Sequence, residues 1–510
     1  MKISELIKNT PCKLIQGNPD TEITSLVYDS RKATPGAMFV AMVGAESDAH
    51  KYIPDVIAKG ASAIVVEMDR LTVKVPDNVT VISAEDTRLA LALLSANWFG
   101  HPADKLTTIG ITGTKGKTTT SYMVKSILDA AGRKCGLIGT IEIIIGDEHI
   151  HSLNTTPESY LVQEYFSEMV KSGMTHVVME VSSQALKYHR VAGINFDIGI
   201  FTNIEPDHIG AGEHTDFNDY MNAKSMLFAQ CKLGIFNADA EHLDGILKGH
   251  TCSVKSFGLY DGSAREKRDD IPDELTGIPD YAASETRLIE RSGSLGVCFH
   301  ISTGRRADDS EEDIDINMPG SFSVHNALGA IAACRECGVS YDAVKAALSK
   351  IRVNGRVELM PVSDKFTVII DYAHNAMGLE SLLTTLKAYK PKRLVTVFGC
   401  GGNRARDRRF SMGEVSSRLS DLTVVTSDNP RFEEPMDIIN DIITGIKKAD
   451  GEYTVIPDRD KAIEYSIKNA KPGDVIVIAG KGHEDYQEIK GVRHHMDDHE
   501  MVMSCADKAL

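Results

Sequence analysis

Short runs of apolar residues alternate with amphipathic stretches along most of the chain. The alternation is clearest in the last third, where valine- and isoleucine-rich runs are separated by patterns with helical spacing. We interpret the runs in this part as strands at Phe366–Tyr372, Arg393–Phe398, Leu422–Ser427, Tyr453–Ile456 and Val475–Ala479. Strands that alternate with helices are typical of a parallel sheet, so we predict a doubly wound α/β domain in this part.

The middle of the chain holds runs that are apolar almost without interruption. They lie at Cys135–Ile138, His176–Val181, Ile198–Asn203 and Gly234–Asn237. A strand that is apolar at successive positions is buried on both faces, which again predicts a parallel sheet covered by helices. Residues 261–285 and 304–313 are polar instead, and we predict surface insertions or irregular loops there.

The N-terminal part has shorter strand-like runs, at Ile23–Tyr28, Ala37–Val43, Ala63–Glu67 and Thr80–Ser83. An apolar helix is predicted at Leu89–Phe99, and His101-Pro102 breaks its pattern. We therefore place one boundary near residue 103 and a second near residue 353, before the regular alternation begins. The predicted domains are residues 1–103, 104–353 and 354–510, which suits a chain of 510 residues at about 150 residues per domain.

Composition narrows the class of protein. The apolar share of 42% is sufficient for hydrophobic cores, and the net charge of -16 argues against a nucleic-acid-binding protein. The N-terminus lacks the apolar core of a signal peptide, and no stretch approaches the ~20 apolar residues of a membrane span. We expect a cytoplasmic enzyme with neither a membrane nor a nucleic-acid partner.

The nine cysteines are scattered without a regular framework, so we predict reduced thiols. Cys334 and Cys337 form a C-x-x-C within the helical pattern His325–Cys337. Two small core residues one helical turn apart are favoured over a redox pair at these positions.

The segment Gly110–Thr120, GITGTKGKTTT, carries the most specific chemistry. It follows the apolar run Leu106–Ile111 and precedes the amphipathic stretch Ser121–Ala131, which predicts a strand, a glycine-rich turn and a helix. Backbone N–H groups in such a turn bind phosphate oxygens, Lys117 supplies a positive charge, and Thr118 can offer a hydroxyl to Mg²⁺. Position 111 is Ile, so the strict G-x-x-x-x-G-K-[ST] pattern fails by one residue. We favour a variant phosphate loop over an ordinary strand-to-helix turn.

Polar clusters follow several predicted strands. In the middle part Glu180 ends one run and Asp207-His208 follows another, and such groups near a phosphate loop can hold Mg²⁺. Lys224 lies in a helical pattern, and by pattern alone a solvated helix lysine is favoured there. The last part has clusters at Asp371–His374, Gly399–Arg409, Asp428–Arg431 and Gly480–Glu484. Ligands of doubly wound sheets bind beyond the carboxyl ends of the strands, so these clusters predict a second site.

Several of these segments together resemble the Mur ligase family. They are TGTKGKTTT, NTTPE at Asn154–Glu158, MEVSSQAL at Met179–Leu186, FTN with Asp207-His208, NAKSMLF, DYAHN and SDNPR. The resemblance extends along nearly the whole chain and includes the segments Asp29-Ser30-Arg31 and PGAMFVAMVG. It implies a three-domain α/β architecture and a monomeric, ATP- and Mg²⁺-dependent amide ligase of peptidoglycan synthesis. In that family ATP phosphorylates the carboxylate of a UDP-muramoyl dipeptide, and an amino acid then attacks the acyl phosphate.

The resemblance also implies residue roles. For ATP they are Thr112, Gly113, Thr114, Lys115, Gly116, Lys117, Thr118, Asn326, Arg356, Asp371 and His374. For the UDP-muramoyl dipeptide they are Ser30, Asn154, Thr155, Thr156, Ser182 and Arg190. Thr118, Glu180, His208 and a carbamylated Lys224 match positions for the metal, and Lys117, Glu180, His208 and Lys224 are the expected catalytic residues. Carbamylation turns the ammonium of a lysine into an anion, which reverses the pattern-based interpretation of Lys224.

The choice of amino acid depends on Asp428, Asn429, Pro430 and Arg431, because in the family this DNPR sequence accompanies meso-diaminopimelate. Arginine pairs with a carboxylate through two hydrogen bonds, and diaminopimelate differs from lysine by a distal carboxylate. Arg404, Gly480 and Glu484 match the remaining diaminopimelate positions. Lys115, Gln184, Tyr188 and Asn403 differ from the residues common in the family. A lysine- or ornithine-adding ligase, a ligase outside cell-wall synthesis and a nucleotide-binding module without ligase activity remain the alternatives.

Overall fold

The structure of the chain is a computed structural model that describes residues 1–44, 47–210, 212–262, 270–291, 294–303 and 312–509. The fold divides into two compact units. The first contains Met1–Gly258 and Gly329–Val339, together with the segment that ends at Asp280. The second contains Leu259–Gly262, Tyr281–Leu328 and the chain from Ser340 onward.

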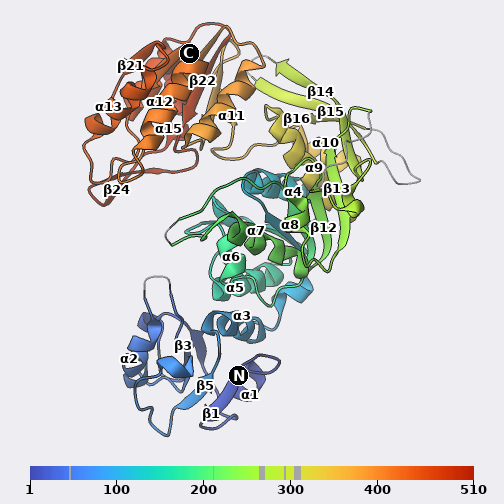
Figure 1. Ribbon diagram of the computed structural model, residues 1–510, viewed down its shortest axis with the longest axis vertical. Helices are drawn as coiled ribbons and strands as arrows, with labels where there is room; N and C mark the ends of the chain where they lie inside the picture. Colours follow the sequence, from blue (N-terminus) through green and yellow to red (C-terminus); the bar gives the residue numbers. More distant parts are fainter. Residues whose placement is uncertain (45–46, 211, 263–269, 292–293, 304–311, 510) are drawn as a thin grey trace. The chain divides into compact units, whose positions relative to one another are not determined.

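The first unit begins with a small five-stranded sheet in the order β1-β5-β4-β3-β2. Its elements are β1 (Lys13–Gln16), β2 (Ser25–Val27), β3 (Ala37–Val40), β4 (Ala63–Val66), β5 (Thr80–Ser83), α1 (Ile3–Leu6), α2 (Ile53–Ala58) and α3 (Thr87–Trp98). Strands β2 to β5 are parallel, and β1 pairs antiparallel with β5. Met38 and Val40 of β3 pack with α1 and α3, whereas Phe39 packs with α2. Both faces of the sheet are therefore covered (Figure 1).

A larger sheet follows in the same unit, in the order β13-β12-β11-β6-β10-β7-β8-β9. Its strands are β6 (Thr107–Thr112), β7 (Cys135–Ile138), β8 (Glu142–Ile145), β9 (Glu148–His151), β10 (His176–Glu180), β11 (Phe196–Phe201), β12 (Cys231–Asn237) and β13 (Ser253–Leu259). The helices are α4 (Lys117–Ala130), α5 (Ser159–Lys171), α6 (Ser183–Lys187), α7 (Phe217–Ser225) and α8 (Leu243–Ile246). The neighbouring strands β13, β12, β11, β6, β10 and β7 are parallel. Because β6 lies between β10 and β11, the loop after β6 stands in the middle of the carboxyl edge.

The second unit opens with antiparallel strands β14 (Tyr281–Arg291), β15 (Ser294–Ser302) and β16 (Glu312–Ile316). The prediction of irregular structure for 261–285 is therefore wrong at its end, where Tyr281, Ala282 and Ala283 are buried in β14. Within the second polar segment, Glu312 and Asp313 belong to β16, and residues 304–311 lie outside the described residues. Helices α9 (Ser321–Glu336) and α10 (Tyr341–Leu348) come next.

The last part of the chain forms a six-stranded sheet in the order β17-β18-β22-β19-β20-β21. Its strands are β17 (Glu358–Met360), β18 (Thr367–Asp371), β19 (Arg393–Phe398), β20 (Leu422–Val425), β21 (Tyr453–Val455) and β22 (Asp474–Ala479). The helices are α11 (Ala376–Lys387), α12 (Asp407–Leu419), α13 (Pro435–Ile446), α14 (Arg459–Lys468) and α15 (Asp498–Ala509). The hairpin β23 (Tyr486–Ile489) and β24 (Val492–His495) stands apart from this sheet.

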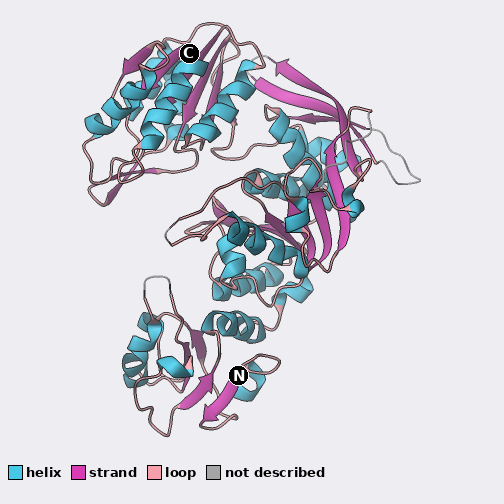
Figure 2. Ribbon diagram, viewed as in Figure 1, coloured by secondary structure: helices cyan, strands magenta, loops and turns pink. Residues whose placement is uncertain are grey.

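Helices cover both faces of this sheet, as the sequence predicts (Figure 2). Val368 and Ile370 of β18 pack in one apolar cluster with α14 and α15, while Ile369 between them is also fully buried. Helices α11, α12 and α13 pack beside one another. Within this sheet, β18, β22, β19, β20 and β21 run parallel, and β17 pairs antiparallel with β18.

Short 3₁₀ helices complete the described structure, at η1 (Ser30–Lys32), η2 (Ala49–Tyr52), η3 (Met68–Arg70), η4 (Pro102–Lys105), η5 (Met226–Ala229) and η6 (Asp273–Leu275). Among the described residues, no helix is both long enough and apolar enough to span a bilayer. All nine cysteines are free thiols, and Cys334 is fully buried within α9. Burial raises the pKa of the Cys334 thiol well above its ordinary value, which suits a core residue rather than a redox group.

Candidate active site

The glycine-rich turn after β6 closes in a conformation that only glycine permits. Gly113 has φ 151° and Gly116 has φ 85°, and Gly116 is the residue before α4. A Cβ atom at Gly113 would lie 1.9 Å from Oγ1 of Thr202, so the position has no space for a side chain. The turn leads directly into the first residues of α4, where backbone N–H groups are available to an anion.

Two residues after β11, Thr202 and Asn203, hold the turn through hydrogen bonds. Asn203 accepts the backbone N–H of Thr114 through its carbonyl at 2.9 Å and that of Lys115 through Oδ1 at 2.9 Å. Thr202 donates from Oγ1 to the carbonyl of Lys115 at 2.7 Å. Within this fixed turn, Nζ of Lys117 donates to the carbonyls of Gly113 (2.8 Å) and Thr114 (3.0 Å), so its charge lies over the loop.

Glu180, the last residue of β10, is a carboxylate bonded to the end of the loop. It is fully buried and accepts a hydrogen bond from Oγ1 of Thr118 at 3.0 Å. Thr140 adds two more, from its N–H at 2.8 Å and from Oγ1 at 3.0 Å. A Cβ at Gly139 would lie 2.6 Å from Oε1 of Glu180, so this glycine gives the carboxylate its space. A buried charge is stable only when it is bonded in this way.

Lys224 lies in α7 and is 1% exposed, so the pattern-based expectation of a solvated lysine is wrong. Its Nζ donates to the carbonyl of Gly113 at 2.8 Å and lies 4.4 Å from the centre of the Tyr220 ring. Burial, and next the charge of Lys117, hold the pKa of Lys224 well below its ordinary value. A neutral amine at this position is a nucleophile, which is the form that reacts with carbon dioxide.

His208 is bonded to a neighbouring carboxylate of its own loop. Its side chain is about half exposed, and Nδ1 lies 3.2 Å from Oε1 of Glu213. In the part of the chain that the structure describes, neither a hydrogen bond nor an ion pair joins His208 to Glu180 or Lys224. Its ring centre lies 6.0 Å from that of Tyr220, the residue that also contacts Lys224. No cluster of three His, Cys, Asp or Glu side chains suited to a metal occurs among the described residues.

The predicted metal residues fit Mg²⁺ in part. Mg²⁺ prefers oxygen ligands, and the carboxylate of Glu180 and the hydroxyl of Thr118 supply two that already lie together. The amine of Lys224 does not fit beside a cation, whereas a carbamate on the same nitrogen would add oxygen donors.

Thr155 and Thr156, two of the residues predicted to bind the dipeptide, connect to Glu180. Oγ1 of Thr155 lies 3.1 Å from Oγ1 of Thr140, which itself bonds Glu180. Thr156 donates to the carbonyl of Glu180 at 2.8 Å and accepts the N–H of Ser182 at 3.0 Å. A continuous set of hydrogen bonds thus joins the phosphate loop, Glu180 and the threonine pair.

Arg190 closes this group, because its Nη1 donates to the carbonyl of Thr156 at 3.1 Å. Asn154 is exposed, and its carbonyl accepts a hydrogen bond from Oγ of Ser152 at 2.8 Å. Ser30 lies apart in η1, where its carbonyl accepts Nζ of Lys59 at 2.7 Å. Among the described residues, no hydrogen bond joins Ser30 to the threonine pair.

In the second unit, the carboxyl end of β18 carries Asp371. Its carboxylate accepts the N–H groups of Val357 and Ala373, both at 2.8 Å. Burial raises the pKa of Asp371, and the charge of Arg356 opposes that effect. Arg356 lies 4.3 Å from the centre of the Tyr372 ring, and Nδ1 of His374 lies 2.9 Å from the carbonyl of Tyr372. Burial lowers the pKa of His374, which favours a neutral imidazole. Asn326, the remaining residue predicted for ATP, lies buried in α9.

The ends of β20 and β22 bring together most residues predicted to bind the amino acid. Nδ2 of Asn429 donates to Oε2 of Glu484 at 2.9 Å, and the OH of Tyr372 donates to Oε1 at 3.4 Å. A Cβ at Gly480 would lie 2.9 Å from Oδ2 of the buried Asp428. Glu484 is thus held between the ends of three strands, with its charge facing a polar environment.

Arg431 lies at the edge of this group with φ 52°, a left-handed backbone that is rare outside glycine. Its Nη1 donates to the carbonyl of Gly402 at 2.9 Å, and its Nε lies 3.4 Å from Oε2 of Glu488. A Cβ at Gly402 would lie 2.0 Å from the carbonyl of Pro430, so the two loops are in direct contact. Arg404 follows in the same loop and is exposed, and its side chain forms no hydrogen bond or ion pair with the described residues.

The sequence assigned no role of their own to three residues of these sites, although Tyr372 and Lys481 lie in its predicted clusters. Thr140 bonds Glu180, Tyr372 connects Arg356 with Glu484, and the fully buried Lys481 has Nζ 3.5 Å from Oε2 of Glu484. Thr140 follows a strand end, and Lys481 lies in the predicted cluster Gly480–Glu484. A threonine or lysine has no periodic signal, so only contacts reveal its role.

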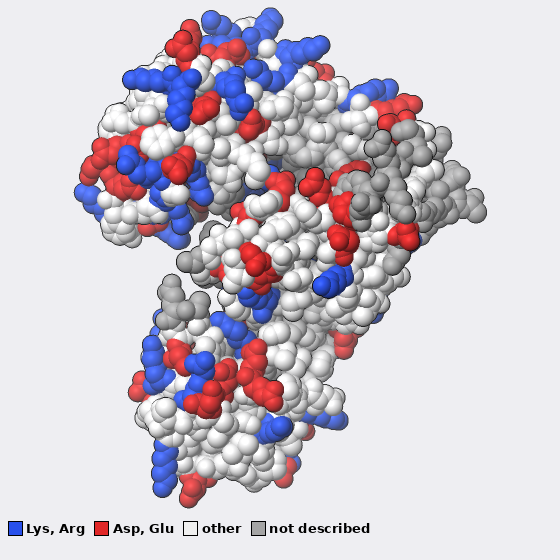
Figure 3. Space-filling view, viewed as in Figure 1, with Lys and Arg blue, Asp and Glu red and all other residues white. Residues whose placement is uncertain are grey.

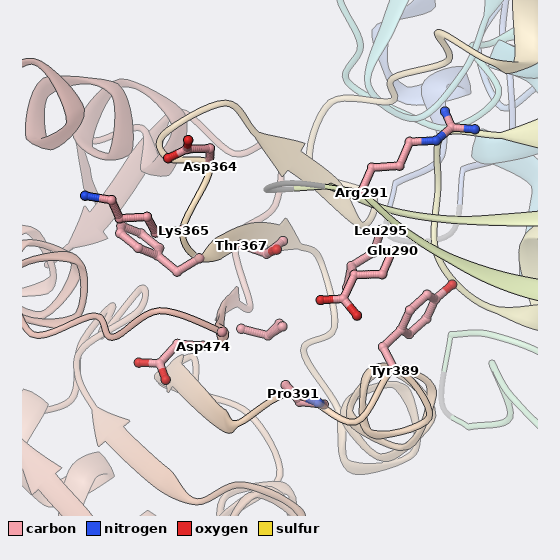
Figure 4. A pocket seen from close by; sticks show the side chains of 12 residues that line it. Glu290, Arg291, Leu295, Asp364, Lys365, Thr367, Tyr389, Pro391 and Asp474 are labelled. Carbon is pink, nitrogen blue, oxygen red and sulfur yellow. The ribbon is translucent and has the colours of Figure 1, made fainter.

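A separate cavity of about 360 Å³ lies at the opposite edge of the C-terminal sheet. Thr367 and Asp474, the first residues of β18 and β22, line it together with Tyr389 and with Glu290 and Arg291 of β14 (Figure 4). The predicted site residues Asp371 and Gly480 stand at the other ends of these two strands. The cavity is thus distinct from the candidate site.

Comparison with known proteins supplies the family. The family descriptions that match are the Mur ligase family, catalytic domain, at residues 22–99, the Mur ligase middle domain at residues 111–334, and the Mur ligase, glutamate ligase domain at residues 355–482. The UDP-N-acetylmuramoyl-L-alanyl-D-glutamate--2,6-diaminopimelate ligase of Clostridium perfringens is 40% identical over 509 residues, which cover 98% of this chain and 99% of the relative. This chain belongs to the Mur ligase family. The family predicted from the motifs is therefore confirmed.

Solved Mur ligases share the architecture of this Mur ligase. The structure of a UDP-N-acetylmuramoyl-L-alanyl-D-glutamate--2,6-diaminopimelate ligase is similar with a TM-score of 0.70 and 27% identity, covering 100% of this chain and 99% of that one. MurF ligase from Thermotoga maritima, solved in complex with ADP, gives a TM-score of 0.56 at 18% identity, with 96% and 97% coverage. At 18% identity, the similarity to MurF ligase shows the fold alone. The predicted α/β architecture of a three-domain Mur ligase is confirmed.

Proposed function

We propose that this Mur ligase joins meso-2,6-diaminopimelate to UDP-N-acetylmuramoyl-L-alanyl-D-glutamate, with ATP as the energy source, in cytoplasmic peptidoglycan precursor synthesis. The observation that carries the proposal is the hydrogen-bond series Thr118–Glu180–Thr140–Thr155. It connects the phosphate loop with the threonines expected to bind the dipeptide, so the two substrates would meet at Glu180. The full-length relative with 40% identity supports the same reaction.

The reaction needs an activated carboxylate. An oxygen of the dipeptide carboxylate attacks the γ-phosphorus of ATP, and ADP leaves. The amine of the amino acid then attacks the carbonyl carbon of the acyl phosphate, phosphate leaves, and the amine loses a proton. Lys117 would move from the loop carbonyls to the phosphates and neutralise their charge, while the N–H groups of the turn orient them. Thr155, Thr156 and Arg190 would hold the dipeptide in line with the γ-phosphate.

Mg²⁺ would be held by Thr118, Glu180, His208 and a carbamate on Lys224. When bound, the ion would supply positive charge to the phosphate oxygens. Glu180 and Thr118 fit this role as they stand. Formation of a carbamate on Lys224 is supported by the lowered pKa of its buried amine and by the adjacent Gly113 carbonyl.

The amino-acid selectivity is assigned to Arg431. A guanidinium at this position would pair with the distal carboxylate of diaminopimelate, and Glu484 would meet the distal ammonium. Asp428, Asn429, Pro430, Arg404 and Gly480 would complete the pocket. We also propose that Asn326, Arg356, Asp371 and His374 contact ATP.

The remaining proposals concern the whole chain. We propose three domains at residues 1–103, 104–353 and 354–510 and a monomeric enzyme with small-molecule substrates. Absence of a nucleic-acid partner is supported by the net charge of -16 and by the acidic and basic side chains interspersed over the face in view (Figure 3).

The test is ADP release with UDP-muramoyl dipeptide in the presence of meso-diaminopimelate, lysine or ornithine. We expect strong stimulation by diaminopimelate alone. Arg431→Ala should lower kcat/KM for diaminopimelate by about 100-fold, the size of a lost charged pair, and leave the KM for ATP unchanged. Arg418→Ala, which removes an exposed arginine paired with Glu380, is the matched control. Preference for lysine or ornithine would retain the ligase and reject the selectivity, and inactivity with all three would reject the proposed reaction.

A further inference from the structure

Glu158 lies between two arginines from distant parts of the chain. Its Oε2 lies 3.8 Å from Nη1 of Arg88 and 3.5 Å from Nε of Arg190. The three side chains are only 17%, 17% and 21% exposed. Oε1 of the same carboxylate accepts the N–H of Ser159 at 3.1 Å and so begins α5.

Each arginine has a further contact that fixes a different segment. Arg190 donates from Nη1 to the carbonyl of Thr156, one of the residues proposed to hold the dipeptide. Arg88 donates from Nε to the carbonyl of Val43 at 2.9 Å, and its guanidinium lies 4.8 Å from the centre of the Tyr188 ring. Through the two arginines, Glu158 therefore connects the threonine pair with the segment at Val43.

A second contact strengthens the same connection. Oδ2 of Asp86 lies 3.3 Å from Nε2 of His189, and Oδ1 of Asp86 accepts the N–H groups of Arg88 and Leu89. The residue before Arg190 is thus joined to the first turn of α3. With two such links, the position of Arg190 depends on α3 as well as on its own loop.

The charges leave capacity for an anion. Two guanidinium groups face one carboxylate, and Nε of Arg190 is buried without a hydrogen-bond partner among the described residues. UDP-muramoyl dipeptide carries phosphates and carboxylates, which are the groups that guanidinium binds best. The arrangement needs a carboxylate to hold the arginines in place, because two adjacent cations would otherwise repel each other.

We infer that Glu158 is a positioning residue for UDP-muramoyl dipeptide: it fixes Arg190 beside Thr156 and, through Arg88, ties it to α3 and Val43. This inference rests on the proposed function and names the residue that prepares the dipeptide site. Glu158 itself contacts neither reacting atom. Its effect should appear in binding of the dipeptide substrate and not in binding of ATP.

The decisive variant is Glu158→Gln, which keeps the size of the side chain and removes its charge. We expect the KM and the calorimetric Kd for UDP-muramoyl dipeptide to rise about tenfold, the size of one charged hydrogen bond. The KM for ATP should stay within about twofold. Glu164→Gln is the matched control, since Glu164 lies on the same helix and forms no ion pair within the described residues.

The sign of the effect separates positioning from simple electrostatics. Removal of a negative charge makes the site more positive, so a purely electrostatic role predicts tighter binding of the anionic substrate. An unchanged or lower Kd in Glu158→Gln would overturn the inference, as would equal changes in the KM for ATP and for the dipeptide.

A second variant covers the case in which Glu158→Gln folds poorly. Arg88→Lys keeps the charge but loses the planar fork, so it should also weaken dipeptide binding and leave ATP binding unchanged. No change in dipeptide binding would count against the inference. If the wild-type chain fails to turn over UDP-muramoyl dipeptide, the proposed function fails. If it is active and both variants match it, only the role of Glu158 is rejected.

Discussion

Uncharged neighbours fix several groups at the phosphate loop. Thr140 gives Glu180 two hydrogen bonds, and Asn203 gives the turn two more through its carbonyl and side chain. Lys117 and Lys224 both donate to the carbonyl of Gly113. The charge of Lys117 beside this oxygen leaves the loop ready for an anion.

Lys224 should take up carbon dioxide across a wide range of pH. An ordinary lysine has a pKa near 10.4, so its neutral fraction falls about tenfold for each unit of pH below that value. The lowered pKa of Lys224 keeps more of the amine neutral at lower pH, so carbamate formation between pH 9 and pH 7 should fall by much less than tenfold per unit of pH. The measurement is the ¹³C NMR signal of the carbamate after degassed protein receives ¹³C-bicarbonate.

Lys224→Met is the control for this experiment and should show no carbamate signal. A tenfold loss of the wild-type signal per unit of pH would indicate an ordinary lysine and contradict the prediction.

At the scale of elements, strands were predicted best where they are buried on both faces. The runs Thr80–Ser83, Cys135–Ile138 and Arg393–Phe398 coincide with β5, β7 and β19. The antiparallel strands β14 to β16 were missed, because β14 is exposed along much of its length and its polar residues read as a loop. Their pairing depends on cross-strand contacts, which a single sequence does not display.

The site residues divide in the same way, into those that the sequence pattern indicates and those that depend on tertiary contacts. Residues in glycine-rich or strand-end clusters were named from pattern, and within each compact unit hydrogen bonds join some of these clusters. The pattern failed for Lys224, whose helix reads as a solvated surface, because the burial of α7 against the phosphate loop is a tertiary contact. The role of His208 beside Glu180 stays a prediction, and its ring lies 3.2 Å from Glu213 in this structure.

Two loops of the amino-acid site are joined by one carboxylate. Glu433 accepts the backbone N–H of Asn403 and also binds Nη2 of the buried Arg409 at 2.7 Å. Glu433→Gln should loosen the loop that carries Arg404 and raise the KM for diaminopimelate about tenfold, while the KM for ATP stays unchanged. Steady-state kinetics with each substrate varied in turn measure both values.

Glu434→Gln serves as the comparison, because Glu434 is the next residue along the chain and its exposed side chain forms no hydrogen bond or ion pair within the described structure. An equal rise in both KM values for Glu433→Gln would point to general loosening of the fold and not to the amino-acid site.

On the scale of the whole molecule, ligands that bind only the folded chain must stabilise it. A ligand at 100 times its Kd adds about 2.7 kcal/mol to the free energy of unfolding. Lys117→Ala should remove the rise in melting temperature that ATP causes and retain the rise caused by UDP-muramoyl dipeptide. Differential scanning fluorimetry with each ligand alone measures both.

Lys134→Ala provides the comparison, since Lys134 is exposed in the same compact unit and should leave both shifts unchanged. If Lys117→Ala retained the full shift with ATP, the loop would not be the nucleotide site.

The crowding at Gly139 restricts the mutations that this position can accept. The space that a side chain would need there is filled by the carboxylate of Glu180, at 2.6 Å from the Cβ position. Every single-base change of a glycine codon that alters the amino acid introduces a side chain or a stop. A substitution at residue 139 would therefore not provide resistance to an inhibitor that occupied the space beside Glu180.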